Sequence, residues 1–169
     1  MPALAAAAIA ITGCGSSSKA PGVEQAPSGG ATEAAVTTTP KPPPAISKKP
    51  TVTVPTGPAP TKLVTKDLVT GTGATLKAGQ TVTVNYVGVL YKTGKEFDSS
   101  WSRNQPFTTA LTTGSVIPGW VQGLPGMKVG GRRELIIPAS LAYGAKGSPP
   151  TIPPNSPLVF VVDLLSIAS

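Results

Sequence analysis

The sequence of 169 residues contains no histidine and only one cysteine, Cys14. Zinc sites need several Cys or His ligands, and the common nucleophilic triads and dyads need a histidine, so neither kind of site is expected. One cysteine cannot form a disulfide within the chain. We therefore expect a protein that needs no metal and no other cofactor.

Acidic side chains are also few: seven Asp and Glu residues stand against fourteen Lys and Arg residues, which gives a net charge of +7. The basic residues are scattered, and only Lys48-Lys49 and Arg132-Arg133 are adjacent. No basic run alternates with aromatic residues, as nucleic-acid-binding surfaces often do. The charge pattern predicts ordinary solvated surface charge and no nucleic-acid partner.

Residues 15–60 lack Leu, Met, Phe, Tyr and Trp, but they contain ten prolines. Such a composition offers little apolar surface to offset the conformational entropy lost on folding. We therefore predict a disordered linker, rich in Pro, Thr, Ala and Ser, over residues 15–60. Every aromatic residue lies after Thr61, so residues 61–169 are predicted to form one globular domain.

An apolar run from Ala3 to Thr12 opens the chain. It is shorter than the roughly 20 residues that a membrane-spanning helix needs, but it fits the core of a signal peptide. The run ends in Ile11-Thr12-Gly13-Cys14, which resembles a bacterial lipobox whose cysteine carries a diacylglycerol. We predict a signal peptide over residues 1–14 and a lipid anchor at Cys14, which would hold the protein on the extracytoplasmic side of a bacterial cell membrane.

An alternative interpretation of this segment is a small hydrophobic N-terminus with an incidental cysteine. No Lys or Arg precedes the apolar run, although signal peptides normally begin with positive charge. If the signal peptide is functional, we expect its true start to lie upstream of Met1.

Residues 80–90 show the clearest strand pattern: Val82, Val84 and Tyr86 alternate with polar residues, as in a strand with one buried face. Glycine-containing turns and runs of Leu, Ile and Val predict further extended segments at 96–98, 133–137 and 158–167. Residues 118–124 are the one plausible helix, since a proline is tolerated in the first turn and Gly-Leu-Pro would end it. One short helix among antiparallel strands predicts an α+β domain.

Five segments of this domain form a recognisable set. They are Leu90 to Ser100 with its Phe-Asp-Ser-Ser ending, Val116-Ile117-Pro118-Gly119-Trp120, Ala142-Tyr143-Gly144, Ile152-Pro153-Pro154-Asn155 and Leu158-Val159-Phe160. Together these segments resemble the FKBP family of peptidyl-prolyl cis–trans isomerases. They occur in the family's order and approximate spacing, from about residue 61 to residue 167. The resemblance implies an antiparallel half-barrel sheet wrapped around one short helix, with a binding pocket between them.

The resemblance also implies which residues form the site. The implied catalytic residues are Tyr86, Phe97, Asp98, Trp120, Tyr143 and Phe160, and the implied substrate-binding residues are Arg103, Phe107, Val116, Ile117 and Ile152. Trp120 would form the pocket floor, and the Ile117 N–H and the Tyr143 hydroxyl would donate to substrate carbonyls. Asp98 would accept a hydrogen bond from Tyr86 and pair with Arg103. The alternative is that these aromatic residues are simply the hydrophobic core.

The implied activity is isomerisation of X-Pro bonds, which assists the folding of exported proteins. The expected partners are proline-containing unfolded or exported polypeptides, the membrane through the lipid anchor, and macrolide inhibitors such as rapamycin. Two alternatives remain: a module that binds proline-containing segments or acts as a chaperone with little turnover, and an interaction lipoprotein that uses the fold only as a scaffold.

Overall fold

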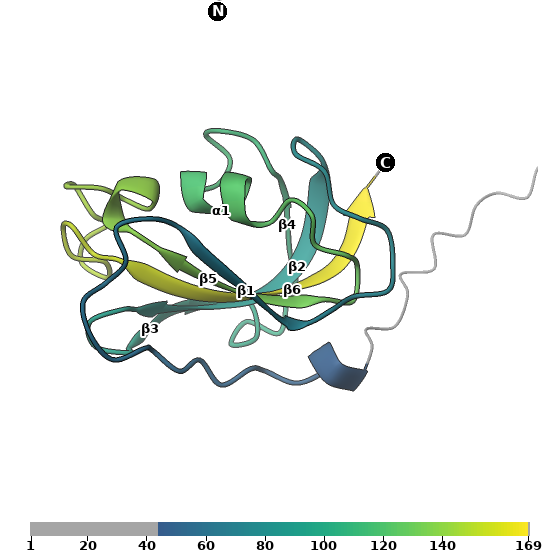
Figure 1. Ribbon diagram of the computed structural model, residues 1–169, viewed down its shortest axis with the longest axis horizontal. Helices are drawn as coiled ribbons and strands as arrows, with labels where there is room; N and C mark the ends of the chain where they lie inside the picture. The colour runs from purple at the N-terminus through teal and green to yellow at the C-terminus, as the bar shows by residue number, and fades with distance from the viewer. Residues whose placement is uncertain (1–43, 169) are drawn as a thin grey trace, which may run out of the picture. The chain divides into compact units, whose positions relative to one another are not determined.

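The computed structural model describes residues 44–168, so the predicted signal peptide, Cys14 and most of the predicted linker lie outside the described residues. This part of the chain forms one six-stranded sheet and one short α-helix (Figure 1). The strands are β1 (Val64–Val69), β2 (Thr81–Leu90), β3 (Glu96–Ser99), β4 (Phe107–Ala110), β5 (Arg132–Ile137) and β6 (Leu158–Ala168). The helix is α1 (Pro118–Gly123), and single 3-10 turns occur at η1 (Pro44–Ile46) and η2 (Ala139–Leu141).

The two long strands β2 and β6 lie in the middle of the sheet. The strand order is β1-β5-β6-β2-β3, every pair is antiparallel, and β4 continues the β3 side by pairing with the first half of β2. In the β2–β6 register Tyr86 lies opposite Val162, and Gly88 lies opposite Phe160. The expected α+β fold, an antiparallel sheet that curves around one short helix, is confirmed.

The alternation predicted for residues 80–90 is present in β2. Val82, Val84 and Tyr86 are buried in the main core, which also contains Trp120 of α1. Strand β6 instead shows eight consecutive buried residues, from Leu158 to Leu165. A central strand becomes buried on both sides when both faces of its sheet are covered.

Helix α1 lies very close to β5. Pro118 occupies its first turn, where a missing N–H costs nothing. A Cβ on Gly119 would come within 2.5 Å of the Ile137 Cγ2, so only glycine allows this approach. The close packing holds Trp120 against the sheet, where its side chain is 4% exposed.

The sequence analysis did not find the short strands β1 and β4. Five of the six residues of β1 are exposed, and two of them are the apolar residues Val64 and Leu68. This strand therefore lacks the alternation of apolar and polar residues by which a half-buried strand is recognised. It pairs only with β5, at the edge of the sheet.

We expected residues 47–60, here called the strap, to belong to a disordered linker, but they pack on the folded domain. The strap runs along the face of the sheet opposite α1 (Figure 1). Val52, Val54 and Ala59 pack there against a second apolar cluster. The cluster consists of Val87, Val89, Tyr91, Ile136 and Val159. The strap has only a few small apolar residues. They are sufficient to hold it on the sheet because the sheet supplies most of the apolar surface.

Three polar contacts also hold the strap on the sheet. Arg132 donates from its Nη2 to the Lys48 carbonyl at 2.8 Å and forms an ion pair with Asp163, which is fully buried. Lys49 pairs with Glu96 at 2.8 Å, and the Tyr91 hydroxyl donates to the Pro58 carbonyl at 3.3 Å. The part of the predicted linker from residue 44 onward therefore belongs to the folded domain.

We expect a fragment of residues 61–169 to be less stable than one of residues 44–169. Removing residues 44–60 takes away the strap and the buried Ile46, exposes the Val87 cluster and uncovers the Arg132–Asp163 ion pair, which should lower the free energy of unfolding by about 2–4 kcal/mol. Urea unfolding of both fragments measures the difference. The full chain is the control and should match the 44–169 fragment; equal stability of the two fragments would show that the strap contributes nothing.

Candidate functional site

A cavity of about 340 Å³ opens between the concave face of the sheet, α1 and the loops beside them. Its walls combine aromatic rings with one carboxylate and one guanidinium group. The lining residues are Tyr86, Phe97, Asp98, Arg103, Phe107, Ser115, Val116, Ile117, Trp120, Tyr143 and Phe160. The structure thus brings together ten of the eleven implied pocket residues, which come from β2, β3, β4, β6, α1 and their connecting loops.

Trp120 lies at the centre of the aromatic set. Its ring centroid is 5.4 Å from those of Tyr86 and Phe160, and both pairs meet edge to face. Such contacts fix the ring in one orientation and are favourable beyond the area they bury. The Trp120 Nε1 is buried and has no hydrogen-bond partner within residues 44–168.

Gly88 makes room for two of the phenylalanine rings. A Cβ at Gly88 would lie 2.7 Å from Phe97 Cζ and 2.8 Å from Phe160 Cε1, far inside contact distance. The rings of Phe97 and Phe160 meet edge to face, with centroids 5.5 Å apart. The role of Gly88 was not predicted from the sequence, although a glycine inside a strand often marks the close approach of another group.

Three polar side chains form a connected network at the rim. The Tyr86 hydroxyl donates to the Asp98 carboxylate, and Arg103 forms an ion pair with the other oxygen of Asp98. Arg103 also donates from its Nη2 to the Tyr86 hydroxyl at 2.8 Å. The network has the connections that the resemblance implied, and it occupies both Asp98 oxygens.

The environment of Tyr86 favours its neutral form. Burial raises the pKa of Tyr86 to about 12, the hydrogen bond to the Asp98 carboxylate acts in the same direction, and the hydrogen bond from Arg103 opposes it. Tyr86 is therefore a hydrogen-bond donor at neutral pH. Burial also raises the pKa of Tyr143, and the negative charge of Asp98 adds to this effect.

Ser100 fixes the position of the segment that carries Phe97 and Asp98. Its side chain is fully buried and accepts a hydrogen bond from the Tyr86 N–H at 2.9 Å. Its hydroxyl donates to Asn85 Oδ1 at 3.0 Å, and its N–H donates to the Tyr86 carbonyl at 3.1 Å. These bonds join the end of β3 to β2 and so set the distance between Asp98 and Tyr86.

The remaining residues lie where the resemblance placed them, with one exception. Val116 and Ile117 are half-buried in the wall before α1, and Tyr143 is 40% exposed above the cavity. Ile152 does not line the cavity; it is 4% exposed and packs in the main core. Ser115 lines the cavity but was not expected, because a small polar residue before a known motif gives no signal of its own.

The cavity is suited to holding an apolar ring rather than to metal or proton chemistry. Its only two charged groups, Asp98 and Arg103, neutralise each other. Within residues 44–168 no group of three or more His, Cys, Asp or Glu side chains could hold a metal ion. What remains is a mostly apolar pocket with a few hydrogen-bond donors at its rim.

Alkaline titration should detect the neutral state of Tyr86. The wild-type protein should show one phenolate absorbance change that Tyr86→Phe lacks. The midpoint of this change should lie at about pH 12, compared with the ordinary tyrosine pKa of 10.0. Asp98→Asn should lower this midpoint, because a neutral partner opposes ionisation less, while burial keeps it above the ordinary value. A midpoint at the ordinary value, in protein that circular dichroism shows to be folded, would contradict the network.

Comparisons with known proteins agree with this fold. The family model described as FKBP-type peptidyl-prolyl cis-trans isomerase matches residues 73–165. An FK506-binding protein of Streptomyces anulatus is 53% identical over 121 residues, which cover 71% of this chain and 98% of the relative. An FK506-binding protein of Neisseria meningitidis serogroup A is 46% identical over 105 residues, which cover 62% of this chain and 95% of the relative.

A solved structure shows the same fold. The crystal structure of AtFKBP13 superimposes with a TM-score of 0.59 at 40% sequence identity, and the match covers 65% of this chain and 96% of that one. Residues 73–165, which the family model matches, contain every residue that lines the aromatic cavity. The chain therefore belongs to the family of FKBP-type peptidyl-prolyl cis–trans isomerases.

Proposed function

We propose that the chain catalyses cis–trans isomerisation of X-Pro bonds in exported proteins, and that the aromatic cavity is the catalytic site. The observation that carries this proposal is the cavity itself, with Trp120 at its centre and the Tyr86–Asp98–Arg103 network at its rim. It has the size and apolar character that a prolyl ring requires.

The reaction has a barrier of roughly 18–20 kcal/mol, which arises from amide resonance. Uncatalysed exchange therefore takes tens to hundreds of seconds, but no bond needs to be broken to accelerate it. An apolar cavity disfavours the charge-separated planar amide, and donors can favour the twisted one. The reaction needs neither an acid–base pair nor a nucleophile.

The residues of the cavity can be assigned roles on this basis. Trp120 supports the prolyl ring, and the Phe97 and Phe160 rings enclose it and exclude water. The Ile117 N–H and the Tyr143 hydroxyl donate to substrate carbonyls; the Tyr143 hydroxyl makes no hydrogen bond within the described part of the chain. Asp98 holds Tyr86 and Arg103 in place and does not transfer a proton.

We also propose that the cavity binds macrolides of the FK506 and rapamycin type. Support comes from the relatives in Streptomyces anulatus and Neisseria meningitidis, which are named FK506-binding proteins. The aromatic lining offers the apolar contacts that such a ligand would use.

Membrane anchoring through Cys14 is the third part of the proposal. It is supported by the lipobox-like Ile11-Thr12-Gly13-Cys14 after an apolar run. In the part of the chain that the structure describes, no helix is both long and apolar enough to cross a bilayer. A lipid anchor would keep the isomerase beside polypeptides as they leave the secretion machinery.

The two tryptophans provide a matched test of the catalytic site. Trp120→Leu should reduce isomerase activity about tenfold or more, since losing about 1.4 kcal/mol of transition-state stabilisation is tenfold in rate. Trp101→Leu should cost stability but little activity, because Trp101 packs on the opposite face of the sheet. NMR exchange of an X-Pro peptide with an apolar residue before the proline measures both variants. Folded wild-type protein without activity would favour a binding module instead.

Fractionation should test the anchor. In bacterial cells the wild-type protein should be found with membranes and should incorporate a labelled fatty acid, because the Cys14 thiol carries the lipid. Cys14→Ser should move the protein to the soluble fraction or leave its signal peptide uncleaved. Cys14 is the only cysteine among the 169 residues, so none of the others can take its place in this sequence. Soluble, unlabelled wild-type protein would exclude the anchor and leave the isomerase assignment intact.

A further inference from the structure

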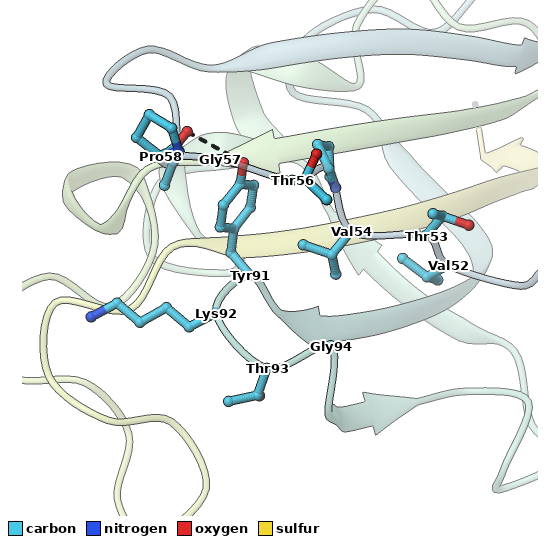
Figure 2. A pocket seen from close by; sticks show the side chains of 12 residues that line it. Val52, Thr53, Val54, Thr56, Gly57, Pro58, Tyr91, Lys92, Thr93 and Gly94 are labelled. Atoms are coloured by element: carbon cyan, nitrogen blue, oxygen red, sulfur yellow. Dashed lines mark hydrogen bonds between the residues drawn. The ribbon is translucent and has the colours of Figure 1, made fainter.

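A second, larger cavity of about 770 Å³ lies on the face of the sheet opposite α1. It is a groove between residues 52–59 of the strap and residues 91–94, the turn between β2 and β3 (Figure 2). It shares no lining residue with the aromatic cavity. A molecule bound in this groove would therefore leave the isomerase cavity open.

The walls of the groove mix apolar and hydroxyl-bearing side chains. The Tyr91 ring stands between the turn and Pro58, and its hydroxyl donates to the Pro58 carbonyl (Figure 2). Gly94 of the turn faces Val54 of the strap: a Cβ there would lie 3.8 Å from the Val54 Cγ2, an ordinary contact distance. Thr53 and Thr56 line the strap side, and their hydroxyls make no hydrogen bond within residues 44–168.

The strap backbone beside this groove resembles an unpaired strand. Thr51 and Thr53 are exposed while Val52 and Val54 are partly buried, which is the alternation of a strand with one face on an apolar surface. Residues 51–54 form no backbone–backbone hydrogen bond with any other described residue. Their N–H and C=O groups are therefore available to an added strand.

The charge around the groove favours an anionic occupant. Lys92, the second residue of the turn, extends away from the strap (Figure 2), and Lys95 follows directly after the turn. Neither lysine forms an ion pair within the described residues. The one carboxylate next to the turn, Glu96, is already paired with Lys49. No free carboxylate lines the groove.

We propose that the groove is a second binding site and takes an extended polypeptide segment with acidic side chains, which pairs as a strand with residues 51–54. The free backbone groups supply hydrogen bonds independent of sequence, Tyr91 and Val54 contact apolar side chains, and Lys92 attracts the acidic ones. The site does not require proline and does not depend on isomerase activity. It allows the domain to hold a client chain while the aromatic cavity acts on another part of it.

Titration of the full chain with two proline-free acetylated peptides tests this proposal. One peptide alternates valine with glutamate and the other alternates valine with lysine; without proline, neither is a substrate of the isomerase cavity. The glutamate peptide should shift the amide NMR signals of Thr53, Val54, Thr93 and Gly94 saturably. The lysine peptide should bind at least about threefold more weakly than the glutamate peptide. Shifts confined to the aromatic cavity, or no saturable shift with either peptide, would overturn the proposal.

A pair of lysine variants distinguishes specific binding in the groove from general electrostatic attraction to a basic protein. Lys92→Glu should weaken binding of the glutamate peptide about threefold or more, because it replaces attraction with repulsion. Lys128→Glu changes the net charge equally at an exposed position outside the groove and should leave binding unchanged. Equal weakening by both variants would show that binding is non-specific and would overturn the proposal.

Discussion

The antiparallel pairing of β2 with β6 is the constraint on which the rest of the structure depends. It runs over ten residue pairs from Thr81 to Leu90 with one irregularity between Thr83 and Val84, and beyond it, from Val84 to Leu90, side chains alternate between the two faces of both strands. The same register therefore sends Tyr86 and Phe160 to the aromatic cavity and Val87 and Val159 to the cluster beneath the strap. A slip of one residue would exchange the two sets and remove both surfaces at once.

The sequence predicted those parts of the molecule that have a local or motif-based signal. The alternation of Val82, Val84 and Tyr86 identified β2, and proline in a first turn identified α1. The motifs identified nearly all residues around the cavity, because the Phe-Asp and Gly-Trp pairs occur in fixed positions. Ile152 shows the limit of this reasoning: a residue next to a pocket loop can face the core instead.

The parts that the sequence did not predict depend on what a distant segment provides. Nothing in the strap itself indicates order, because Val52, Val54 and Ala59 are buried only against apolar residues from four other places in the chain. The role of Gly88 is similar, since the rings that require its missing side chain come from β3 and β6. Composition describes a segment in isolation, whereas burial depends on the surface that the rest of the fold presents to it.

The strap also determines how the domain bears mechanical load. If the folded region began at residue 61, a pull on the preceding chain would act directly on β1, an edge strand, and peel it from β5 one pair at a time. A pull applied ahead of Pro44 instead reaches the sheet through Arg132 at the start of β5, Glu96 in β3 and Tyr91 after β2. These contacts with three parts of the sheet must give way before the pull reaches β1, so the edge strand is protected from peeling.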